Sequence, residues 1–274
     1  MSDYTFTQLG KETNYSDSYD PALLCPIARV VARQSDTDTK TLPFIGVDLW
    51  TGYELSWLNM DGLPQVAIVE FIIPFDSPFI VESKSFKLYL NSYIQTKFSS
   101  MELVGSQLEK DLSAAAGAHI EVALYEINEY QGIQPISEPQ GVCIDGQPVV
   151  IDTYRPDINL LKVCGDTFAD ETIYSHLLKT NCPVTDQPDW ASIYIFYKGP
   201  QIDPEGLLKY IVSYRQHQDF HEQCVEQIFL DIMSACKPTE LSVYARYMRR
   251  GGLDINPFRS THLERPPLFR QVRQ

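Results

Sequence analysis

The chain has 274 residues, of which 44% are hydrophobic and 21% are charged, as in ordinary globular proteins, so we exclude an intrinsically disordered chain. Lys and Arg number 22 and Asp and Glu 36, giving a net charge of −14, which argues against general coating of nucleic acid because phosphates need a basic surface. No apolar run approaches the roughly 20 residues of a membrane helix, and residues 1–4 lack the features of a secretion signal. We therefore expect a cytoplasmic protein with neither a nucleic acid nor a membrane as its direct partner.

Six cysteines are scattered along the chain without a C-x-x-C pair, a spacing that fits neither a zinc ribbon nor a redox dithiol. A chain of this length in a reducing compartment needs no disulfide, so we expect free thiols that are mostly buried and inert. One of them could act as a nucleophile. The cysteines are Cys25, Cys143, Cys164, Cys182, Cys224 and Cys236.

The residues up to about 45 are polar, with clusters of Asp, Ser and Thr, and predict an irregular segment. A run of β-branched and aromatic residues closed by Pro74 then predicts a strand. Apolar residues at helical intervals predict two helices, the second of which ends at Gly117, and an alternating pattern predicts another strand. In the first half these four elements span residues 65–74, 84–98, 103–116 and 119–127.

The same order of strand, helix, helix and strand recurs about 120 residues later, where Pro204 opens the first helix. An upstream hairpin partner is expected for the first strand of each half. Pro, Gly and Asp between residues 132 and 157 predict a linker between the halves. In the second half the elements span residues 189–197, 204–213, 220–235 and 241–248, and the expected hairpin partners are residues 46–55 and 176–180.

This tandem repeat predicts an α+β fold, in which two helices cover one face of each antiparallel sheet. The chain contains no G-x-G-x-x-G string, which disfavours a dinucleotide-binding Rossmann domain. We place an N-terminal module at residues 1–135 and a C-terminal module at residues 136–274.

The first candidate site combines a cysteine with an acid in the second half. Cys182 stands before two prolines and ahead of a predicted strand, which favours a constrained loop, and Asp189 follows seven positions later at the strand entrance. A thiolate and a positioned proton donor are the pair that adds a thiol across an unsaturated carbon and protonates the heteroatom. A turn with an incidental cysteine explains the same residues.

The second candidate lies at the head of the last predicted helix. Glu222 there is favoured by the helix dipole, which is explanation enough for an acid at this position. Alternatively, it is a buried carboxylate that accepts two N–H donors from the amidine edge of a purine-like base. His221 beside it is, on its own, more often structural than catalytic.

Two further strings favour an anion. Glu82, Ser83 and Lys84 lie where the first-half helix begins, and backbone N–H groups at such a position can meet an anion. The string RRGG at residues 249–252 offers two arginines, which suit phosphates, and two glycines, which allow a close backbone approach. Seven arginines from residue 246 onward oppose two acids, a local charge of +5 that fits either an anion site or a solvated basic tail.

Together these strings resemble the NADPH-dependent 7-cyano-7-deazaguanine reductases, the nitrile reductases of the queuosine pathway, in their longer two-module form. The resemblance spans essentially the whole chain, and the motifs follow one another in the right order. It implies that each module is a tunnelling fold, and a homodimer, because two modules cannot close the barrel alone. The matching strings are ESKSFKLY at 82–89, CPVT at 182–185, QPD at 187–189, FHE at 220–222 and RGG at 250–252.

The resemblance also implies a mechanism. The Cys182 thiolate attacks the nitrile carbon to give a covalent thioimidate, and Asp189 protonates the nitrogen. Two NADPH molecules then complete a four-electron reduction of 7-cyano-7-deazaguanine to 7-aminomethyl-7-deazaguanine, with shielding of the imine from water.

By the same resemblance, Cys182 and Asp189 are the catalytic residues, and no metal takes part. Two alternatives stay open, namely a metal-dependent cyclohydrolase of the same fold and a non-catalytic purine-binding module. The substrate-binding residues implied are Val81, Glu82, Ser83, His221 and Glu222, and those that contact NADPH are Ser83, Lys84, Arg250 and Gly251.

Overall fold

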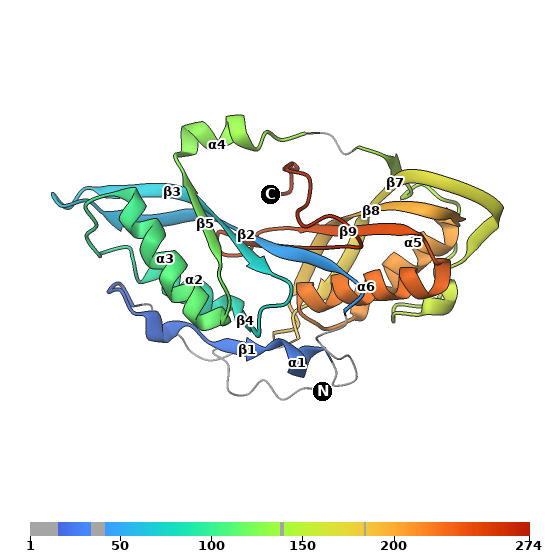
Figure 1. Ribbon diagram of the computed structural model, residues 1–274, viewed down its shortest axis with the longest axis horizontal. Coiled ribbons are helices and arrows are strands. Elements are labelled where there is room, and N and C mark those ends of the chain that lie inside the picture. The colour runs from blue at the N-terminus through green and yellow to red at the C-terminus, as the bar shows by residue number, and fades with distance from the viewer. Residues whose placement is uncertain (1–15, 34–41, 138–139, 184) are drawn as a thin grey trace. The chain divides into compact units, whose positions relative to one another are not determined.

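The computed structural model describes residues 16–33, 42–137, 140–183 and 185–274 (Figure 1). Most of the polar segment expected before residue 45 therefore lies outside the described residues, as does Val184 of the cysteine string. The chain divides into two compact units. Unit 1 comprises Met1–Thr41, Asp48–Ile136 and Arg249–Asp254, and unit 2 comprises Leu42–Val47, Ser137–Met248 and Ile255–Gln274.

Unit 1 follows the predicted order of strand, helix, helix and strand, with a hairpin partner in front. Its strands lie in the order β5-β3-β2, and β5 pairs antiparallel with β3, Phe71 opposite Val122. Phe86 lies in T-shaped contact with Trp50 and Phe71, which seats the first helix on β2 and β3. The elements are β2 (Ile45–Leu58), β3 (Pro64–Pro74), α2 (Ser83–Asn91), α3 (Met101–Ala116) and β5 (Glu121–Tyr125).

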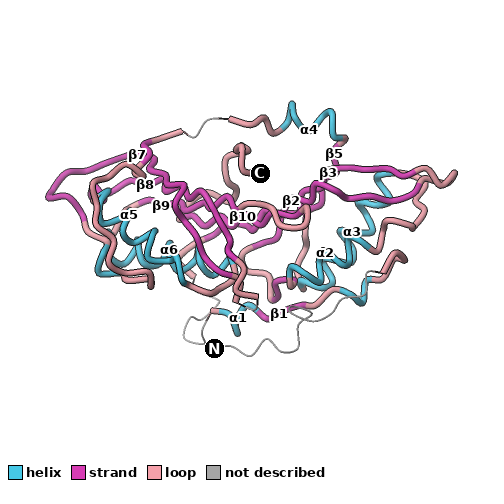
Figure 2. The backbone as a smooth tube through the Cα atoms, turned by 180° about the vertical axis from the view of Figure 1, so that it is seen from behind, coloured by secondary structure: helices cyan, strands magenta, loops and turns pink. Residues whose placement is uncertain are grey.

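Unit 2 repeats this arrangement. Its strands lie in the order β10-β9-β8-β7-β6, with β7 to β10 antiparallel and the two-residue β6 parallel to β7. The two helices run next to each other, as α2 and α3 do in unit 1 (Figure 2). The elements are β6 (Val142–Cys143), β7 (Val163–Asn181), β8 (Pro188–Ile202), α5 (Pro204–Ser213), α6 (His221–Cys236), β9 (Glu240–Tyr247) and β10 (Leu253–Ser260).

The ends of the helices show the same repeat. Glu82 caps α2 and Asp203 caps α5, each carboxylate accepting hydrogen bonds from two backbone N–H groups of the first turn. The second helix of each pair ends at a left-handed residue, Gly117 after α3 and Lys237 after α6. The predicted α+β fold with tandem modules is confirmed.

Several elements differ from the sequence-based expectation. The helix expected over residues 84–98 ends at Asn91, because the chain tightens into turns in which Tyr93 and Ile94 bond to carbonyls three residues back. Tyr93 is still buried, which explains why the apolar spacing continues past the helix end. Elements not predicted are β1 (Pro26–Ala28), α1 (Arg29–Ala32), β4 (Phe79–Val81), α4 (Ile127–Ile133), β6 and β10, and three short 3-10 helices (Pro21–Leu23, Ile158–Leu160 and Tyr214–Gln216).

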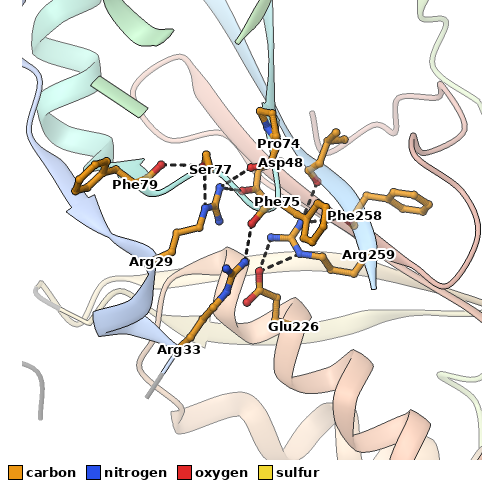
Figure 3. Close-up of polar contacts among 11 residues, drawn as sticks. Arg29, Arg33, Asp48, Pro74, Phe75, Ser77, Phe79, Glu226, Phe258 and Arg259 are labelled. Atoms are coloured by element: carbon orange, nitrogen blue, oxygen red, sulfur yellow. Dashed lines mark hydrogen bonds and ion pairs between the residues drawn. The ribbon is translucent and has the colours of Figure 1, made fainter. Parts of the chain in front are cut away.

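Each unit also contains a buried ion pair (Figure 3). In unit 1, Arg29 binds Asp48 at 2.6 Å and donates from Nε to Ser77 at 3.0 Å. In unit 2, Arg259 binds Glu226 at 2.7 Å. Such charges are tolerated in a core only when they are paired and hydrogen-bonded, so each pair fixes the elements that carry it.

Candidate active site

The β7–β8 hairpin of unit 2 carries Cys182 at its tip. Its backbone N–H donates to the carbonyl of Gln187 at 2.9 Å, and its own carbonyl accepts from Asp186 at 3.1 Å. Asp186 adopts a left-handed φ of 56° and is held by Gln218 through a 2.9 Å side-chain bond. The expected constrained loop is present, and the Cys182 side chain within it is buried.

Asp189 lies at the same end of the hairpin. Asn181 pairs with Pro188 and Thr180 pairs with Asp189. Cys182 and Asp189, seven positions apart in the sequence, therefore lie at the same end of one hairpin. The Asp189 side chain is only 5% exposed. The Asp189 carboxyl group is therefore shielded from bulk water at the hairpin end.

His221, the first residue of α6, reaches this acid from another element. Its Nε2 lies 3.4 Å from Oδ2 of Asp189, and its Nδ1 lies 3.3 Å from the carbonyl oxygen of Ile255. Glu222 follows it and is buried, whereas Glu102, at the corresponding position of α3, is exposed. The structure thus brings Asp189 and His221 into contact and buries the neighbouring carboxylate.

The electrostatic surroundings distinguish the cysteines of unit 2. Burial, and then the negative charges of Asp219, Glu222 and Asp189, raise the pKa of the Cys224 thiol well above its usual value. Burial alone raises the pKa of Cys236 to about 11. Both therefore stay thiols near neutral pH, and since the thiolate is the reactive form, neither is suited to be a nucleophile.

In unit 1 the predicted substrate residues lie where β4 meets α2. Val81 pairs with Pro26 of β1, and Glu82 is fully buried. The Glu82 carboxylate accepts from the backbone N–H of Lys84 at 2.6 Å and of Ser85 at 2.8 Å. For these two backbone N–H donors, the anion expected at the helix start is thus the Glu82 carboxylate itself. The pKa of the Glu82 carboxyl group is raised, mainly by burial.

The RRGG string forms a tight turn in unit 1. Arg250 and Leu253 exchange backbone hydrogen bonds at 2.9 and 3.4 Å, and the two central glycines have φ of 59° and 77°, values that disfavour other residues. A cavity of about 170 Å³ lies against this turn. Its lining residues are Gly52, Glu54, Leu55, Lys87, Leu90, Asn91, Ile94, Gly251, Gly252 and Leu253.

Two residues near these groups were not expected. Lys87 lines the cavity, and its Cδ lies 3.4 Å from where a Cβ at Gly251 would be. The sequence did contain a hint of this position, because Lys87 belongs to the same matched string as Lys84, but its pattern is also that of an ordinary solvated lysine. Tyr247 stacks on His221 with 3.6 Å between ring centroids, and its place in an apolar strand pattern made it look like simple core.

The candidate residues are divided between the two units. Cys182, Asp189, His221 and Glu222 belong to unit 2, and Val81, Glu82, Ser83, Lys84, Arg250 and Gly251 belong to unit 1. Within the described part of the chain, no three His, Cys, Asp or Glu side chains are grouped to hold a metal ion. No helix there is long and apolar enough to cross a membrane.

Two family models match the sequence. Residues 15–124 match "Nitrile reductase, 7-cyano-7-deazaguanine-reductase N-term", and residues 188–266 match "QueF-like protein". A protein of Paraburkholderia phytofirmans is 53% identical over 268 residues, covering 97% of each chain. A protein of Chromobacterium violaceum is 53% identical over 253 residues, covering 92% of this chain and 90% of its own. Both are named NADPH-dependent 7-cyano-7-deazaguanine reductase.

Proposed function

This chain belongs to the NADPH-dependent 7-cyano-7-deazaguanine reductase family, and from that premise we propose that it reduces the nitrile through a covalent thioimidate on Cys182. The chain is an NADPH-dependent nitrile oxidoreductase of the queuosine pathway. Family membership favours this activity over a cyclohydrolase or a binding module.

The first step is addition of the thiolate. The Cys182 sulfur forms a bond to the nitrile carbon, one C–N π bond breaks, and the nitrogen takes a proton from Asp189. The observation that carries this assignment is the contact of Asp189 with His221 at the hairpin end that holds the cysteine. The raised pKa of Cys224 supports it further, since that neighbouring thiol cannot supply the thiolate.

Reduction requires the cofactor, which when bound supplies hydride twice per turnover, four electrons in all. The protein's part is to hold the substrate carbon, release the Cys182 thiolate when the C–S bond breaks, and keep water from the imine. Asp189 and His221 hold the protons that the nitrogen takes up as its bonds to carbon are reduced. Glu222 is the proposed carboxylate for the base, with His221 and the Val81–Ser83 residues of unit 1.

The cofactor-binding residues remain a proposal, and the RRGG turn supports it. The glycine backbone at Gly251 and Gly252 lies beside the cationic side chain of Lys87, a combination that suits a phosphate. A cavity of about 170 Å³ matches such a group rather than a whole dinucleotide. We therefore add Lys87 to Ser83, Lys84, Arg250 and Gly251 as a contact for NADPH.

Intact mass measurement tests the covalent step. Incubation with 7-cyano-7-deazaguanine in the absence of NADPH should raise the mass of the protein by one substrate, and adding NADPH should remove the adduct as absorbance at the reduced nicotinamide band falls. Turnover without any adduct, in single-turnover samples quenched over time, would contradict the thioimidate.

A further inference from the structure

His221 is held on one face by an aromatic ring. Its imidazole lies 3.6 Å from the ring of Tyr247, with an angle of 6° between the planes. Tyr247 ends β9 and is fully buried. Its backbone N–H donates to Oδ1 of Asn256 at 3.0 Å, and its carbonyl accepts from Nε2 of Gln274 at 3.1 Å. Hydrogen bonds to both its N–H and its carbonyl thus fix the backbone of Tyr247, which carries the stacking ring.

The two nitrogens of His221 face different partners. A carbonyl oxygen only accepts, so Nδ1 must carry a hydrogen to bond Ile255. Nε2 faces the Asp189 carboxyl group, so a proton on either group can be shared between them. When the pair carries this proton, it is either an imidazolium beside a carboxylate or a neutral imidazole that accepts from a protonated acid. Both arrangements hold one proton ready for transfer.

This arrangement depends on the orientation of the ring. The outer torsion of a histidine side chain is broad and roughly twofold, so a half-turn exchanges nitrogen and carbon positions at little local cost. Such a turn would place a C–H group against Asp189 and leave the proton unshared. A coplanar aromatic ring on one face restricts tilting, and this keeps Nδ1 within reach of the Ile255 carbonyl, which selects the correct half-turn.

We propose that Tyr247 is a positioning residue for nitrile reduction, which holds His221 in the one orientation that shares a proton with Asp189. The inference rests on the proposed function, because it takes the Asp189–His221 pair as the proton source. Tyr247 acts through its ring, not through its hydroxyl, which burial among Cys224 and nearby carboxylates keeps protonated by raising its pKa. The titratable groups that act on Tyr247 and on the adjacent Cys224 are Asp189, Asp219 and Glu222.

Two substitutions separate the ring from the hydroxyl. Tyr247→Phe keeps the stacked ring and should retain kcat within about threefold. Tyr247→Leu removes the ring and should lower kcat and the rate of adduct formation on the order of 10- to 100-fold, since small misplacements of catalytic groups cost this much, with the KM for NADPH unchanged. If the leucine variant does not fold, Tyr247→Met provides an unbranched apolar side chain at the same site. Equal losses in the Phe and Leu variants would overturn the proposal, because the hydroxyl would then be the active group.

Nitrogen NMR of the imidazole gives a readout independent of turnover. The chain has five histidines, and His221→Ala identifies the signal. Wild type and Tyr247→Phe should show a protonated Nδ1, whereas Tyr247→Leu should show a population without it. An unchanged Nδ1 signal in Tyr247→Leu would sink the inference whatever the kinetics show.

A double substitution distinguishes this inference from the proposed function. If Tyr247 acts through His221, adding Tyr247→Leu to His221→Ala should lower kcat no further. A full additional loss would show that Tyr247 acts elsewhere. If His221→Ala instead turns over like wild type, the proton role in the proposed function fails, even where the NMR signal shows that Tyr247 orients the ring.

Discussion

The hydroxyl of Tyr210 donates to the Asp231 carboxylate at 2.6 Å, and in unit 1 Tyr89 makes the same bond to Asp111 at 2.7 Å. Each of these tyrosines shares a hydrogen bond with a second tyrosine four residues later, just past the end of its helix. Each aspartate also accepts from a glutamine four residues earlier. The second tyrosines are Tyr214 and Tyr93. Within each unit the same polar network thus joins the two helices, and its residues recur about 120 positions later in the chain.

Removing one hydroxyl from this network should destabilise the chain. Tyr210→Phe leaves Asp231 and Tyr214 each short of one buried hydrogen bond, a loss of about 1–3 kcal/mol in the free energy of unfolding. Thermal unfolding should show a lower Tm by about 2–4 °C per kcal/mol. Tyr89→Phe is the matched variant of unit 1, and Tyr154→Phe, at a partly exposed residue, is the control. A Tm equal to wild type in both network variants would contradict a stabilising role.

The sequence predicted the longer helices and strands, and it missed the short elements and β10. β10 is buried on nearly every residue, so it shows no alternation, and its start at the glycine turn resembled a ligand-binding loop. α4 spans only Ile127–Ile133, and its Tyr130 is held by a bond to the buried Glu70 at 2.9 Å. Such a short helix depends on tertiary contacts, which no local pattern contains.

The candidate site, too, could be predicted from the sequence only in part. The spacing of Cys182 and Asp189 was readable because both lie at one end of a single hairpin. The contact of Asp189 with His221 joins elements that are distant in the sequence, and pattern alone could not pair them. Glu82 was proposed from its motif, but its burial and its capping of α2 follow only from the packing of the helix start.

Cys182→Ala should abolish both adduct formation and turnover, because no other side chain can replace the nucleophile. Intact mass and NADPH absorbance measure the two. Alanine or serine at Cys25, Cys143, Cys164 or Cys236 should keep activity, since a packing cysteine affects stability alone. An adduct that survives in the Cys182 variant would refute the assignment.

Alkylation should separate the thiols of the folded protein by site. At pH 8, iodoacetamide should modify the exposed Cys143 and leave Cys224 and Cys236 intact. The sign follows from the raised pKa values, because a thiol whose pKa is raised stays protonated and unreactive below it. Peptide mapping by mass spectrometry measures the labels, and denatured protein, in which all three react, is the control. Rapid labelling of Cys224 in the folded state would mean that its surroundings are wrongly described.

The chain should form a homodimer. Tunnelling-fold sheets close into a barrel by pairing across subunits, and an uncovered sheet edge promotes aggregation. Light scattering coupled to size exclusion at micromolar concentration should give twice the chain mass of 31.3 kDa. A fully active protein with the mass of one chain would contradict this.

The cationic residues of unit 1 should distinguish NADPH from NADH. The 2′-phosphate adds negative charge to a protein already at −14, so productive binding needs local cations, for which Lys84, Arg249 and Arg250 are the candidates. Arg249 lies over the ring of Tyr53 at 4.6 Å, and among the three the matched family motifs favour Arg250 first and Lys84 second. Losing one charge-assisted contact costs on the order of 1.5–3 kcal/mol, or about ten- to a hundredfold in affinity.

Arg250→Ala should therefore raise the KM for NADPH by about ten- to a hundredfold and change the KM for NADH far less. Adduct formation at Cys182 should persist, because that step precedes hydride transfer. Lys198→Ala, which removes a half-exposed lysine paired with Asp170 in unit 2, is the charge-matched control and should leave both constants unchanged. Steady-state kinetics with each nucleotide measures the effect. If the variant with alanine at Lys84, Arg249 and Arg250 uses NADPH and NADH with wild-type constants, this cluster is a solvated basic surface and the phosphate is bound elsewhere.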